Sequence, residues 1–117
     1  TSKKACAKML LANSGVNVTV SQIGDKNRSI MDILTQYMKK EPINLTGSTL
    51  EEVLYYVSEG RAVIAMKSNG QAVLITEYDE FNITMIDPEL GRTWKEGYKD
   101  GSKMFEKAGN IFISFIE

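Results

Sequence analysis

The sequence predicts an α+β domain, with amphipathic helices in its first half and an antiparallel sheet in its second. Before Gly60, apolar residues recur at the helical period in successive stretches. After Gly60 the chain changes to short runs rich in valine, isoleucine and threonine, separated by turn residues. Helices followed by strands, without regular alternation, are typical of segregated α+β proteins.

Length and composition predict a single domain over residues 1–117. The chain is 43% hydrophobic and 25% charged, an ordinary globular mixture. Fourteen basic residues oppose fifteen acidic ones, so the net charge indicates neither a nucleic-acid partner nor an anionic membrane surface. The longest apolar run, Ala62–Met66, is too short to cross a bilayer. Because the chain begins with Thr1, we expect it to be excised from a longer protein.

The first predicted helix runs from a cap at Thr1 or Ser2 to about Asn13, and Ser14-Gly15 ends it. Its apolar residues fall at the spacing i, i+1, i+4 and i+5, which predicts one buried stripe made of Ala5, Cys6, Met9 and Leu10.

Three further helical segments precede the strands. One turn of helix is expected between Ser21 and Gly24, and a longer amphipathic helix begins at Asn27 or Ser29 and ends before Pro42. The segment Ser48-Thr49-Leu50-Glu51 matches a capping box for the next helix, which Gly60 terminates.

The second half predicts an antiparallel meander with a short helix before its last strand. The turn signals are Ser68-Asn69-Gly70, Asp79-Glu80 and the segment from Asp87 to Gly91. The strands are expected at 62–67, 71–78, 81–86, 92–95 and 111–116, and the helix at 102–107.

The residues of this chain give little support for a metal or cofactor site. With no histidine and a single cysteine, a zinc site would need carboxylates alone, and no glycine-rich phosphate loop occurs. We therefore predict no metal and no cofactor. The carboxylate pairs Glu51-Glu52 and Asp79-Glu80 suit a helix start and a hairpin turn, so we interpret them as structural.

The one thiol is a weak candidate nucleophile. Cys6 lies on the apolar stripe of the first helix, where a cysteine is usually inert packing. Nucleophilic catalysis also needs a base within hydrogen-bond reach, and the usual partner, histidine, is absent.

The order of the motifs resembles the C39-type peptidases, the papain-like cysteine peptidase domains of bacteriocin-processing transporters and their relatives. After an opening helix come three segments, in the family's order: Gly60-Arg61-Ala62-Val63-Ile64, Gly70 through Tyr78-Asp79, and a strand that ends in Asp87-Pro88-Glu89-Leu90-Gly91. The resemblance covers nearly the whole chain. It implies a papain-like fold, with N-terminal helices packed on a C-terminal antiparallel sheet.

The match departs from the family pattern at the catalytic residues. The family histidine falls on Gln71, which cannot accept a proton near neutral pH, while the orienting acid falls on Asp87. Aligning Ala5 and Met9 with the family's helix pattern places the catalytic cysteine on Ser2. The alternative register, with Cys6 as nucleophile, loses the Met9 match. The family's oxyanion-hole glutamine would lie upstream of residue 1.

Asp87 has two interpretations that stay open at this point: a retained functional acid, or a side chain that caps an Asp-Pro turn. An engineered cysteine-to-serine change would explain Ser2 but not Gln71, so natural degeneration is the simpler account.

The resemblance leads us to expect a bacterial, non-catalytic C39-like domain of a transporter or surface protein. It would face the cytoplasm at a membrane transporter or lie outside the cytoplasm. Its partner would be a polypeptide held in the former substrate cleft, between the first helix and the sheet, with Ser2, Gln71 and Asp87 as candidate contacts. Two alternatives remain: a purely structural module of an extracytoplasmic protein, and a hydrolase that uses Ser2 with a base from outside these residues.

Overall fold

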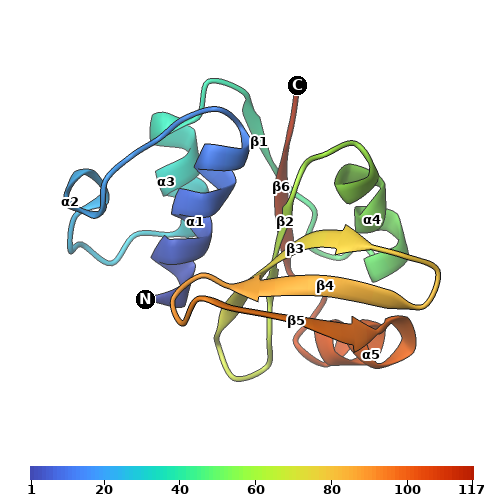
Figure 1. The fold of residues 1–117 in the computed structure, drawn as a ribbon. Coiled ribbons are helices and arrows are strands. Elements are labelled where there is room, and N and C mark those ends of the chain that lie inside the picture. Colours follow the sequence, from blue (N-terminus) through green and yellow to red (C-terminus); the bar gives the residue numbers. More distant parts are fainter.

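The computed structural model describes all residues from 1 to 117 as five helices and six strands (Figure 1). In chain order they are α1 (Ser2–Asn13), α2 (Val20–Ile23), α3 (Ile30–Tyr37), β1 (Glu41–Asn44), α4 (Leu50–Ser58), β2 (Val63–Met66), β3 (Ala72–Tyr78), β4 (Asn82–Asp87), β5 (Arg92–Gly97), α5 (Tyr98–Lys107) and β6 (Phe112–Ile116). None of the helices has both the length and the apolar character needed to cross a membrane.

The six strands form one antiparallel sheet in the order β1-β6-β2-β3-β4-β5. Strands β2 to β5 follow the predicted meander, but β6, predicted as its last strand, does not pair with β5. The last strand, β6, returns to lie between β1 and β2, so the C-terminal segment joins the two halves of the chain.

Helices cover both faces of this sheet (Figure 1). The sheet divides the core into two clusters, because the side chains of neighbouring residues in a strand point to opposite faces. Ala72 and Leu74 of β3 pack with α1 and α3, whereas Val73 and Ile75 pack with α4 and α5. The sheet is therefore the middle layer of three.

The predicted α+β class is confirmed, and most predicted helix limits agree with their caps. Thr1 caps α1 through a hydrogen bond from the Lys4 N–H to its hydroxyl oxygen, and Ser29 caps α3 in the same way through the N–H of Asp32. Gly60, with φ +79°, follows the end of α4 in the left-handed conformation that favours glycine.

Several details of the predicted elements are wrong. Strand β1 was not expected, and Pro42 lies within it rather than in a loop. Proline is tolerated there because β1 is an edge strand that pairs only with β6. The capping box of α4 lies one residue later than predicted, between Thr49 and Glu52. Helix α5 begins at Tyr98, four residues before the predicted start.

The buried face of α1 also differs from the predicted stripe. Met9 is 37% exposed and Ala5 is partly exposed, whereas Ala7 and Leu11 join Cys6 and Leu10 in the core. The buried face is rotated toward residues 7 and 11 because α1 packs against both the sheet and α3. The spacing of apolar residues in the sequence does not reveal that α1 also packs against α3.

Candidate functional site

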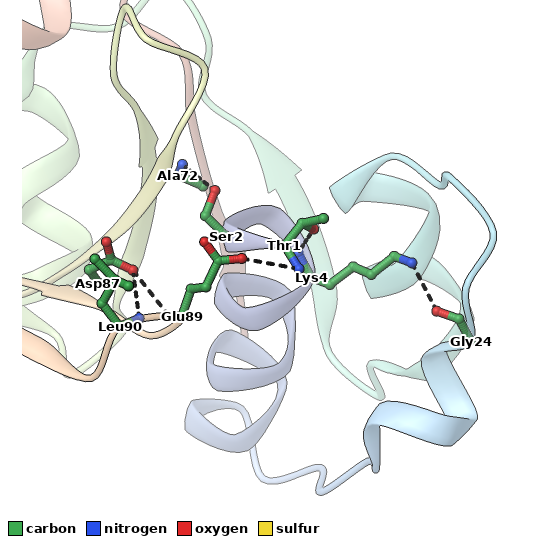
Figure 2. Close-up of polar contacts among 8 residues, drawn as sticks. All are labelled: Thr1, Ser2, Lys4, Gly24, Ala72, Asp87, Glu89 and Leu90. Atoms are coloured by element: carbon green, nitrogen blue, oxygen red, sulfur yellow. Dashed lines mark hydrogen bonds and ion pairs between the residues drawn. The ribbon is translucent and has the colours of Figure 1, made fainter.

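The N-terminal end of α1 meets the start of β3 through the side chain of Ser2. The backbone N–H of Ala72 donates a hydrogen bond to the Ser2 hydroxyl oxygen at 3.0 Å (Figure 2). Ser2 is 8% exposed and Ala72 is fully buried. The residue at the predicted nucleophile position therefore accepts a backbone hydrogen bond, and no acceptor for its own hydroxyl proton is present among the protein's hydrogen bonds.

Gln71, the predicted counterpart of the family histidine, immediately precedes the residue that bonds Ser2. Its side chain is held in the β2–β3 turn, where its amide oxygen accepts a hydrogen bond from the side-chain amide of Asn69 at 3.2 Å. The backbone N–H of Gln71 donates to the Asn69 side-chain oxygen at 3.0 Å. Gln71 is half-buried and does not hydrogen-bond Ser2.

Asp87 ends β4 and is 6% exposed. One of its carboxylate oxygens accepts hydrogen bonds from the backbone N–H groups of Glu89 and Leu90, at 3.1 and 3.2 Å (Figure 2). These bonds hold the turn between β4 and β5, as the capping interpretation predicts. Asp87 hydrogen-bonds neither Ser2 nor Gln71.

The three candidate positions thus gather near one end of α1 without forming a hydrogen-bonded chain. In Figure 2 the turn after Asp87 lies beside the start of α1, and the carboxylate of Glu89 reaches the amino group of Thr1 at 3.3 Å. Lys4 extends away from this group, toward the carbonyl oxygen of Gly24. The arrangement contains an acid and a hydroxyl, but no base between them.

Cys6, one helical turn after Ser2, is fully buried in the core beneath α1. Burial, with the negative charges of Asp87 and Glu89 as smaller causes, raises the pKa of the Cys6 thiol to about 12. A thiol with this pKa carries almost no thiolate at neutral pH, and the thiolate is the nucleophilic form. Cys6 is therefore a packing residue, and the register that makes it the nucleophile is disfavoured.

A polar hollow of about 390 Å³ opens where α1 begins. Of the three candidate positions, only Ser2 lines it, together with side chains from the loop between α2 and α3 and with Gly70 of the β2–β3 turn. A second hollow, of about 400 Å³, shares Lys3, Asn27 and Arg28 with the first and continues over apolar side chains. These are Ile30, Met31, Ile64, Met66, Ile111 and Ile113.

Lys3, Asn27 and Arg28 were not predicted as site residues, although Asn27 is one of two predicted helix starts. They come together only because the α2–α3 loop passes beside the start of α1. No three histidine, cysteine, aspartate or glutamate side chains lie close enough to hold a metal ion.

Comparison with known proteins supports the fold. No family model matches this sequence, and no curated protein matches it. Among solved structures, a crystal structure of a protein from Bacillus anthracis, inferred to be a C39-like peptidase, is similar with a TM-score of 0.82. The alignment covers 98% of this chain and 88% of that one, at 14% sequence identity. This chain therefore has the fold of a C39-like peptidase: helices on a six-stranded antiparallel sheet.

Proposed function

We propose that this domain is a non-catalytic member of the C39-like fold that holds a polypeptide segment in the former substrate cleft. The observation that carries the proposal is the state of the Ser2 side chain. It occupies the position where the resemblance places the nucleophile, yet it is 8% exposed and accepts a hydrogen bond from the backbone of β3.

The remaining residues supply no substitute for a Cys–His pair. The chain has no histidine, and its one thiol is buried and protonated. Asp87 is engaged by two backbone N–H groups of its own turn, and Gln71 is neutral. A serine without a neighbouring base is a poor nucleophile, so hydrolysis would need a group from elsewhere.

The two adjoining hollows support a binding role. A polar end at Ser2 and Lys3 continues into an apolar end at Met31 and Met66, which suits an extended segment with polar backbone and apolar side chains. The free hydroxyl proton of Ser2 could donate to a carbonyl oxygen of such a segment. We further propose that the domain belongs to a larger transporter or surface protein, which the full-length chain would test.

One observation favours the purely structural alternative. The hydrogen bond between Ser2 and Ala72 joins α1 to the sheet, so the old nucleophile position now stabilises the packing of the two layers. A domain that retains the fold only as a spacer would show this bond and bind nothing.

A peptide-display selection with the purified domain tests the proposal. We expect enrichment of a common sequence pattern, and loss of binding in Gln71→Trp, which places a large ring next to Gly70 at the edge of the polar hollow. The exposed substitution Lys103→Trp on α5 is the matched control. Failure to enrich any pattern, or equal binding by Gln71→Trp, would support the structural alternative.

Catalysis is tested separately. The domain should release no product from a pool of fluorogenic peptides. Turnover that is abolished by Ser2→Ala would contradict the non-catalytic assignment and support the serine hydrolase.

A further inference from the structure

A second surface lies at the far side of the molecule from Ser2. It is formed by α4, the turn between β3 and β4, and the start of α5, all on the right of Figure 1, whereas α1 begins on the left. A hollow of about 560 Å³ opens among them. We call it the tyrosine–carboxylate hollow; its lining is Glu51, Leu54, Tyr55, Ser58, Tyr78, Asp79, Glu80 and Tyr98.

Local structure explains why these side chains share one surface. The four residues from α4 are spaced i, i+3, i+4 and i+7, so they form one face of that helix. The backbone N–H of Tyr98 donates to the carbonyl oxygen of Phe81 at 2.8 Å, which ties the start of α5 to the β3–β4 turn. The hollow therefore lies among three elements that pack together: α4, the β3–β4 turn and the start of α5.

The aromatic side chains are the first sign of a ligand. Three of the chain's five tyrosines line the hollow. Tyr55 is 58% exposed and Tyr78 is 42% exposed, and Phe81, in the adjoining turn, is 71% exposed. No other aromatic residue of this protein is exposed to that degree. Exposed rings that gather on one surface are typical of interaction sites, because their burial there adds apolar contact area.

The charges are the second sign. Glu51, Asp79 and Glu80 line the hollow, and no cationic side chain does, although the whole chain carries a net charge of only −1. Two basic groups act on the residues that line the hollow: Lys95 on the charge of Asp79, and Arg61, which lies beside Tyr55. Backbone hydrogen bonds from Phe81 and Asn82 lower the pKa of Asp79, so this carboxylate is ionised at neutral pH.

Arg61 is an internal example of a cation that contacts tyrosine rings beside this hollow. The guanidinium of Arg61 lies 5.0 Å from the ring centroid of Tyr56 and 6.0 Å from that of Tyr55. A cation over a tyrosine face is attracted by the ring quadrupole, and a nearby carboxylate adds to the attraction. Tyr78 and Tyr98 have no such internal partner among the cation–ring contacts of the structure.

We propose that the tyrosine–carboxylate hollow binds an arginine- or lysine-bearing segment of a partner protein. The cationic head lies against the ring of Tyr78, which has no internal cation, while Tyr55 forms a second aromatic wall and Glu51 and Glu80 are the counter-charges. The proposal is independent of the cleft at Ser2, because no residue is shared between the two surfaces.

Fluorescence anisotropy with two labelled peptides tests it. One peptide has arginines alternating with glycine and serine, and the other has citrulline, the neutral isostere, in place of each arginine. We expect the arginine peptide to bind roughly three- to thirtyfold more tightly at low salt, since the cation–ring and ion-pair terms act together. Raising the salt concentration should reduce this difference.

Variants of the full chain then assign the site. Tyr55→Ala and Tyr78→Ala should each weaken binding roughly two- to fivefold, the effect of one exposed cation–ring contact. Tyr55→Phe keeps the ring and should bind normally. Glu80→Gln should weaken binding, and Glu41→Gln, the same change on the exposed edge strand β1, should not. Gln71→Trp should leave binding of the arginine peptide unchanged.

Three results would overturn the inference. These are no binding of the arginine peptide, equal binding of the citrulline peptide, and unchanged binding in the double variant of Tyr55 and Tyr78. Because Gln71→Trp reports on the other surface, each failure here is distinguishable from a failure of the proposed cleft function.

Discussion

The hydroxyl oxygen of Ser2 accepts a hydrogen bond from the backbone N–H of Ala72, and this single bond joins the start of α1 to the start of β3 across the core. The two residues are 70 positions apart in the sequence. The place where the resemblance puts a nucleophile is therefore a buried contact between two layers.

Removing this acceptor should destabilise the fold. Ser2→Ala leaves the buried N–H of Ala72 without a partner, which should lower the free energy of unfolding by about 1–3 kcal/mol. Urea denaturation followed by circular dichroism measures the change. Ser21→Ala, at an exposed position of α2 with no side-chain hydrogen bond, is the control and should change stability little. Equal stability of the two variants would mean that water replaces the bond.

Cys6 should make stability fall at alkaline pH. The folded pKa is about 12 and the ordinary value is 9.0, so the unfolded chain loses the thiol proton first as the pH rises. The stabilisation that comes from the protonated Cys6 thiol is complete below pH 9. Between pH 9 and about 12 it is lost, and the free energy of unfolding falls by up to about 1.4 kcal/mol per pH unit.

The measurement compares the original chain with Cys6→Ala. Other groups titrate alike in both proteins, so the difference in their free energies of unfolding between pH 8 and 10.5 isolates the thiol. Parallel curves across this range would show that the thiol is not desolvated in the folded state.

The capping residue of α4 is predicted to be Thr49 and not Ser48. Thr49 accepts a hydrogen bond from the N–H of Glu52, whose carboxylate accepts the N–H of Thr49 in return. Thr49→Ala should therefore lower the free energy of unfolding by about 1 kcal/mol, and Ser48→Ala by much less. If thermal denaturation shows a larger loss of stability for Ser48→Ala than for Thr49→Ala, Ser48 is the capping residue, as the sequence pattern indicated.

The alignment of Ser2 and Gln71 with a catalytic pair can be tested by restoring the pair. In a Cys6→Ala background, Ser2→Cys introduces a single thiol, whose pKa serves as the reference. Adding Gln71→His should lower that pKa by about one unit or more, because an imidazolium close to the thiol stabilises the thiolate.

The pH dependence of the alkylation rate measures both values. Glu77→His places a histidine at the exposed far end of β3 and should leave the thiol unchanged. If Gln71→His has no more effect than Glu77→His, the side chain at position 71 does not face position 2, and the alignment of the two sites is wrong.

The candidate site was predictable only in part. The sequence pattern led to Ser2, Gln71 and Asp87, and the turn chemistry of an Asp-Pro segment correctly suggested that Asp87 caps its own turn. Which side chains line the hollow beside Ser2 was not predictable. Lys3 and Arg28 meet there through the course of the α2–α3 loop, and loop paths depend on the elements that they connect.

The sequence by itself determined the local structure and one chemical limit. Hydrophobic period, caps and turn residues place ten of the eleven elements, since these signals act over a few residues. The absence of histidine removes Cys–His catalysis from the chain's own residues. The tertiary structure decided the rest. The return of β6 between β1 and β2, the Ser2–Ala72 bond and the tyrosine–carboxylate hollow all join residues distant in sequence, and only the packing of the layers brings such residues together.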